Sequence, residues 1–135
     1  MKTLKKTILF LLICSMLTET INISAAGESF SFTFYNKIHK QQTESYPKED
    51  NEQNAYVTIQ DTVGDDFTEG DVFGCRVRKA SNESAVTDYT LMTQYGRYVL
   101  PYTSTGYTGT EYFLRGQIDS SGEYSFMIIG GVWLP

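Results

Sequence analysis

A run of carboxylates between residues 61 and 71 comes nearest, in this chain, to the pattern of a metal site. Calcium takes about six to eight oxygen ligands, and a turn that contains Gly64 and Gly70 could fold several carboxylates around one ion. The spacing differs from that of an EF-hand loop, so a solvated acidic turn at the end of a sheet is the favoured interpretation. The residues that would hold calcium under the first interpretation are Asp61, Asp65, Asp66, Glu69 and Asp71.

Residues with catalytic chemistry are sparse. A glycosidase needs two carboxyls across a cleft; Glu111, Asp119 and Glu123 lie near turns, but small domains commonly carry such carboxylates on their surfaces. Nucleophilic catalysis needs a base held beside the nucleophile, and the single histidine, His39, lies in a polar stretch far along the chain from Cys75. One His and one Cys also cannot fill a tetrahedral zinc shell. We therefore expect a non-enzymatic protein with no catalytic residues and no cofactor.

Tyrosine is the most unusual feature of the composition, with ten in the chain. Three of them, Tyr102, Tyr107 and Tyr112, surround the segment TSTGYTGT. Tyrosines exposed together could stack on sugar rings or anchor a protein interface, which would make this loop a binding edge. The favoured alternative is that they fill half-buried strand positions with their hydroxyls at the rim.

The elements that must position these residues are strands. Apolar and aromatic side chains alternate with polar ones in FSFTF, AYVTIQ, VFGCRVRK and EYFLRGQI, and no segment after residue 26 has helical apolar spacing. The pattern predicts an all-β antiparallel sandwich or small barrel of about seven or eight strands. The polar residues 37–54 are expected to form a long loop. The expected core consists of Phe30, Phe32, Phe34, Val57, Ile59, Phe73, Cys75, Val77, Leu91, Leu100, Leu114, Ile128 and Trp133.

Residues 1–26 have the three parts of a signal peptide. Three lysines precede an apolar run, and the small residues SAA precede Gly27. The apolar run of about ten residues is too short to cross a bilayer, so stable membrane insertion after processing is not expected. The sequence predicts a secreted protein whose mature part is a single β domain, residues 27–135, and the style of the leader suggests a Gram-positive bacterium. Cys75 would then be the only cysteine left, without a partner for an intrachain disulfide.

The charge of residues 27–135 limits the classes of molecule that can be expected as partners. Residues 27–135 contain eight Lys and Arg against fifteen Asp and Glu. An acidic surface does not attract phosphate backbones or anionic lipid headgroups, so nucleic acid is not expected as a partner. A cell-envelope glycan or another protein is expected instead.

The motifs FSFTF, AYVTI, GCRVRK, YVLPYTS, EYFLRG and SGEYSFMIIGGVWLP resemble a family of small exported Gram-positive proteins known as domain of unknown function 2712. That resemblance implies export and no particular activity. In size, leader, aromatic strands and terminal Trp the chain also resembles bacteriocins of the lactococcin 972 type. The leading hypothesis is a binding or interaction module at or outside the cell envelope, and the alternative is a bacteriocin-like or toxin-like protein that acts on competing cells.

Overall fold

The computed structural model describes residues 27–62 and 64–135, and the expected signal peptide lies outside these residues. The described residues form nine strands and no helix, so none of their elements is a helix that could cross a membrane. The all-β prediction is confirmed. The strands are β1 (Glu28–Phe34), β2 (Lys40–Gln42), β3 (Tyr46–Pro47), β4 (Asn54–Gln60), β5 (Phe73–Lys79), β6 (Thr90–Met92), β7 (Gly96–Pro101), β8 (Glu111–Ile118) and β9 (Met127–Leu134).

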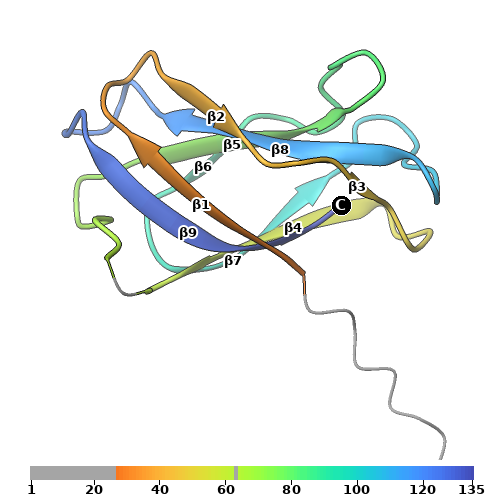
Figure 1. Cartoon of the computed structure of the whole chain (residues 1–135), viewed down its shortest axis with the longest axis horizontal. Coiled ribbons are helices and arrows are strands. Elements are labelled where there is room, and N and C mark those ends of the chain that lie inside the picture. The colour runs from red at the N-terminus through yellow and green to blue at the C-terminus, as the bar shows by residue number, and fades with distance from the viewer. Residues whose placement is uncertain (1–26, 63) are drawn as a thin grey trace, which may run out of the picture.

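The strands make two antiparallel sheets that face each other as two layers (Figure 1). One sheet has the order β1-β9-β4-β7; the other has the order β2-β8-β5-β6, with β3 also paired to β8. The two layers are joined on one side by Gln41 of β2, whose side-chain amide exchanges hydrogen bonds with the backbone N–H and C=O of Thr33 in β1. This amide occupies backbone groups at the edge of β1 that would otherwise be free to pair with another chain.

Aromatic side chains fill the space between the sheets, as their alternation along the strands dictates. Phe30, Phe32 and Phe34 of β1 all pack on Phe73 of β5, with ring centres 6.1–6.5 Å from its ring. Trp133 closes the other part of the same core and is fully buried. The single described cysteine, Cys75, is also buried and free, and its burial raises the pKa of its thiol, so it behaves as a small apolar side chain.

Two residues of the expected core lie elsewhere. Leu91 is 47% exposed and its neighbour Met92 is buried in its place, because Met92 pairs with the inward-facing Phe73 while Leu91 pairs with the outward-facing Gly74. Ile128 is only half-buried, because Met127 and Ile129 on either side of it point inward. In both cases the strand has its predicted position, and the alternation is shifted by one residue.

The polar segment 37–54, expected to be a loop, contains two short edge strands. β2 and β3 both pair with β8. They are strands because the backbone of β8 supplies their hydrogen-bond partners, and the polar sequence of the segment does not reveal this pairing. Lys48, which follows β3, is buried; its ammonium group lies 2.6 Å from the Asp50 carboxylate and 3.2 Å from the carbonyl oxygen of Pro135. The segment is therefore tied to the sandwich at several points.

Candidate anion-binding site

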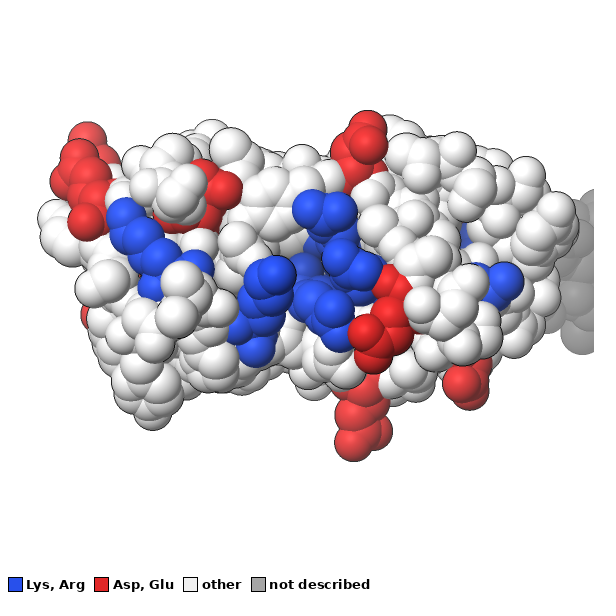
Figure 2. All heavy atoms as spheres, turned by 90° about the horizontal axis from the view of Figure 1, so that it is seen from above, with Lys and Arg blue, Asp and Glu red and all other residues white. Residues whose placement is uncertain are grey.

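Four cationic side chains share the outer face of the β2-β8-β5-β6 sheet. They are half of the eight Lys and Arg in residues 27–135, and Figure 2 shows Lys and Arg atoms gathered in the middle of this face. The strand register brings them together: Arg76 of β5 is directly opposite Arg115 of β8, and Lys40 of β2 is opposite Gln117 of β8. We call Lys40, Arg76, Arg78 and Arg115 the basic face.

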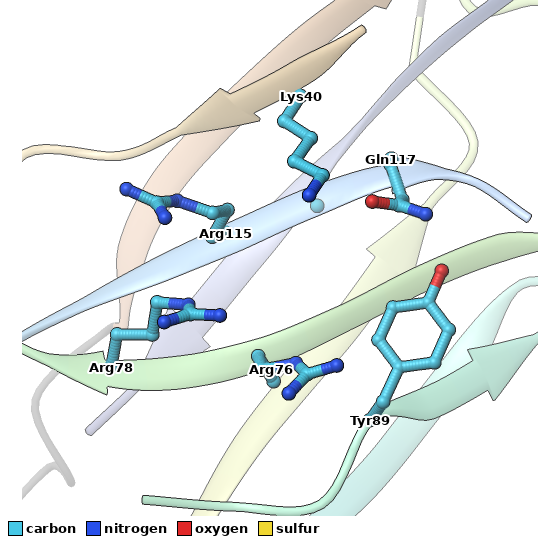
Figure 3. Close-up of a pocket in the computed structure, with 7 residues that line it drawn as sticks. Lys40, Arg76, Arg78, Tyr89, Arg115 and Gln117 are labelled. Atoms are coloured by element: carbon cyan, nitrogen blue, oxygen red, sulfur yellow. The ribbon is translucent and has the colours of Figure 1, made fainter. Parts of the chain in front are cut away.

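The basic face surrounds a shallow hollow of about 210 Å³. In Figure 3 the labelled side chains lie around a central gap, with Arg115 and Lys40 above it and Arg78 and Arg76 below it. Tyr89 and Gln117 are placed at one end of the gap, away from Arg78 and Arg115. Arg78 and Arg115 therefore lie at one end of the hollow, Tyr89 and Gln117 lie at the other, and Arg76 and Lys40 lie between them.

Aromatic rings and a glutamine hold two of these guanidinium groups in place. The Arg76 guanidinium lies 5.2 Å from the centre of the Tyr89 ring, and that of Arg115 lies 5.2 Å from the centre of the Phe113 ring. Arg115 also donates from Nη2 and Nε to the side-chain oxygen of Gln42, over 2.6 and 3.1 Å. These contacts reduce the freedom that the arginines would lose on binding a ligand.

One carboxylate among the described residues forms an ion pair with the face. Glu83 lies 3.3 Å from Nη2 of Arg115, and its backbone carbonyl accepts from Nη1 of Arg78 over 2.5 Å. The Nε of Arg78 is buried and has no hydrogen-bond partner among the described residues. Desolvation, followed by the charges of Arg115 and Arg76, lowers the pKa of Arg78 below its ordinary value. The cluster thus carries charge repulsion that an anion would relieve.

Tyr89 owes its position to a glycine. The Tyr89 side chain lies across Gly74 of β5, where a Cβ atom would overlap the phenol oxygen. The hydroxyl is buried and has no hydrogen-bond partner among the described residues. Burial, with a smaller contribution from the charge of Asp119, raises the pKa of Tyr89 to about 12, so its hydroxyl is a neutral donor near pH 7.

Two of the five carboxylates in the acidic turn, residues 61–71, accept hydrogen bonds from the backbone of the turn itself. Oδ2 of Asp65 accepts from the N–H of Thr62 over 3.2 Å, and Oδ2 of Asp71 accepts from the N–H of Thr68 over 2.8 Å. Asp61, Asp66 and Glu69 lie on the same turn. Over the part of the chain that the structure describes, no three His, Cys, Asp or Glu side chains form a group that could hold a metal ion. The described carboxylates of the turn therefore do not form such a group.

The tyrosines around TSTGYTGT do not form an exposed row. Tyr112 is only 2% exposed, and Tyr102 packs beside it with ring centres 5.5 Å apart. Tyr107 alone is well exposed, at 64%. The expected binding edge is therefore not assembled, because Tyr112 falls on an inward-facing position of β8 between the buried Leu114 and the end of the strand.

The fold separates Glu111 from the other two carboxylates considered for glycoside hydrolysis, Asp119 and Glu123. Glu111 begins β8, whereas Asp119 directly follows its end. Eight residues of extended strand span about 26 Å, far more than the roughly 5–9.5 Å that such a carboxyl pair needs. Asp119 instead accepts from the N–H of Ser121 over 2.9 Å within the β8–β9 turn, where Glu123 also lies.

The basic face could be anticipated only in part. The alternation in VFGCRVRK puts Arg76 and Arg78 on the strand face opposite to the buried Phe73, Cys75 and Val77, so these two could be anticipated. The contribution of Arg115 and Lys40 depends on the pairing of β5 and β2 with β8, which no local pattern specifies. Comparisons with family models, with curated proteins and with solved structures found no match for this chain.

Proposed function

We propose that this protein is a secreted, non-enzymatic binding module that works at or outside the cell envelope of a Gram-positive bacterium. On this proposal the basic face holds an anionic group of an envelope glycan or of another protein. The observation that carries the proposal is the direct opposition of Arg76 and Arg115, with Arg78 and Lys40 beside them.

The energetics favour a ligand at this position. Like charges directly opposite each other in a sheet destabilise the folded state by about 0.2–1 kcal/mol per pair. The guanidinium group carries paired N–H donors that match the oxygens of carboxylate, sulfate and phosphate groups. An oxyanion between Arg76 and Arg115 would turn their repulsion into attraction.

The lining of the hollow favours binding over catalysis. Its side chains are three arginines, one lysine, one tyrosine and one glutamine, and Gly116 completes it. All of these side chains donate hydrogen bonds, whereas the lining contains neither a carboxylate pair nor a nucleophile with a base. The acidic charge of the rest of the mature chain argues against long polyanions such as nucleic acid and favours a ligand that occupies only this face.

Retention of the purified protein on isolated cell envelopes, peptidoglycan and whole cells tests the proposal. We expect retention that weakens between about 50 and 200 mM salt, because the contacts are ionic. The double substitution Arg76→Gln and Arg115→Gln should abolish it. Arg97→Gln is the matched control, since Arg97 lies on β7 of the other sheet and stacks on Tyr56. Equal retention of the double variant and the control would refute the proposal.

The same preparation separates this function from its alternative. A toxin-like protein that acts on competing cells would inhibit the growth of a susceptible strain, with attachment through the same basic face. A binding module would be retained on cells without any effect on their growth.

A further inference from the structure

We infer, on the basis of the proposed function, that the ligand is a phosphorylated sugar or polyol whose phosphate lies among Arg76, Arg78 and Arg115 while its hydroxyl groups meet Tyr89 and Gln117. The inference assigns a charged end and a neutral end to one ligand, because the hollow itself has these two ends (Figure 3).

The charge of the face favours phosphate over carboxylate. Four cationic groups line the hollow, and Glu83 supplies the one carboxylate that pairs with them among the described residues. A singly charged carboxylate would leave most of this excess unbalanced. A phosphate monoester carries about −1.5 to −2 charges at pH 7 and therefore matches the face better.

The arrangement of the arginines also suits a tetrahedral group. Arg76 and Arg115 approach from adjacent strands about 4.8 Å apart, and Arg78 approaches from two residues further along β5. Donors from three separate directions match the oxygens of a phosphate, whereas a carboxylate offers two oxygens in one plane. The unpartnered Nε of Arg78 provides one donor for which the protein itself supplies no acceptor among the described residues.

The opposite end of the hollow suits hydroxyl groups. The buried Tyr89 hydroxyl is likewise without a partner, and the Gln117 side chain offers both a donor and an acceptor beside it. A raised pKa of about 12 keeps the Tyr89 hydroxyl protonated. Buried donors without partners are costly, so a hydroxylated ligand that satisfies Tyr89 gains affinity there.

The size of the hollow sets the scale of the ligand. Its volume of about 210 Å³ lies below the roughly 300–1,000 Å³ of pockets that enclose a drug-sized molecule. One sugar or polyol phosphate therefore fits, either as a free molecule or as an end group of an envelope glycan.

Calorimetric titration of the purified protein with four probes tests the inference: glucose 6-phosphate, inorganic phosphate, glucuronate and glucose. We expect glucose 6-phosphate to bind most tightly and glucose not to bind. Arg76→Gln should weaken both phosphate probes by about 10- to 100-fold, the usual range for a hydrogen bond to a charged group. Tyr89→Phe should weaken glucose 6-phosphate by about 2- to 10-fold and leave inorganic phosphate unchanged. Arg97→Gln should change nothing.

The outcomes distinguish this inference from the proposed function. Glucuronate that binds as tightly as glucose 6-phosphate would overturn the choice of phosphate. Inorganic phosphate that binds as tightly as glucose 6-phosphate would overturn the role of the hydroxyl groups. If no probe binds, both the choice of phosphate and the role of the hydroxyl groups are overturned. In each case, envelope retention that still requires Arg76 and Arg115 would leave the proposed function standing; loss of that requirement would remove the proposed function instead.

Discussion

The basic face and the acidic turn both concentrate charge of one sign, but the charged groups have different interaction partners in the two regions. In the acidic turn, Asp65 and Asp71 each accept a hydrogen bond from a backbone N–H three residues away, so these carboxylates help to shape the turn. On the basic face, Arg76 and Arg115 are brought opposite each other by strands that are distant in sequence, and one carboxylate among the described residues forms an ion pair with the group. A charge cluster whose groups are used by their own turn can therefore be structural, whereas a cluster of four cations with one ion pair is a candidate ligand site.

Reversal of one charge in each region should give the largest difference in envelope retention between the basic face and the acidic turn. Arg76→Glu would pair with Arg115 and preserve the sheet, yet it should weaken envelope retention by at least about 100-fold through lost contacts and repulsion of the anion. Asp65→Lys, a reversal in the acidic turn, should leave retention unchanged. Binding isotherms on isolated envelopes would show the difference. A gain in retention for Asp65→Lys that matches the loss for Arg76→Glu would indicate that only the overall charge matters.

Truncation in the acidic turn should affect stability and not binding. Asp71 is 3% exposed and accepts from both the N–H and the hydroxyl of Thr68. We expect Asp71→Ala to lower the free energy of unfolding by about 0.5–1.5 kcal/mol, as measured by urea denaturation, with glucose 6-phosphate affinity unchanged. Weaker ligand binding in this variant, with its fold intact, would show that the two regions are coupled.

A methyl group added at Gly74 should weaken ligand binding as much as removal of the Tyr89 hydroxyl does. The Cβ of Gly74→Ala would occupy the place of the Tyr89 phenol oxygen and displace that side chain. Affinity for glucose 6-phosphate should fall about 2- to 10-fold, as for Tyr89→Phe, and the double variant should lose no more than either one. Additive losses would mean that Gly74 acts by some route other than Tyr89.

The smallest expected effect is a gain in stability. Arg76→Gln removes the repulsion between Arg76 and Arg115, so it should raise the free energy of unfolding without ligand by about 0.2–1 kcal/mol. Urea denaturation at low salt would measure it, because salt screens the repulsion. A decrease would mean that the contact between Arg76 and Tyr89 outweighs the repulsion.

The sequence predicted the layers of this fold better than it predicted the site. Alternation in β5 places Phe73, Cys75 and Val77 inside and the arginines outside, because one strand face must be buried against the other sheet. The same reasoning was wrong by one residue at Leu91. Leu91 belongs to β6, which has only three residues, and the pairing of β6 with β5 decides which of them point inward. A short edge strand has too few residues for its own sequence to show which side chains point inward.

The site depends on information that is spread between strands. Tyr112 and Tyr107 are close in sequence, yet the first is buried and the second exposed, so proximity along the chain did not predict a shared surface. Arg76 and Arg115 are far apart in sequence and lie opposite each other only through the register of β5 with β8. Register is a property of the assembled sheet, and a single sequence specifies it through packing rather than through any local motif.

The central claim is that the basic face holds a phosphate-bearing ligand. Its most direct test is the thermal unfolding of the wild-type protein and of Arg76→Gln with increasing glucose 6-phosphate, against sodium chloride at equal ionic strength. A ligand that binds only the folded state raises the unfolding temperature by mass action. We expect a rise for the wild-type protein that chloride does not produce and that is largely lost in Arg76→Gln. An equal response of the two proteins, or no rise beyond that in chloride, would contradict it.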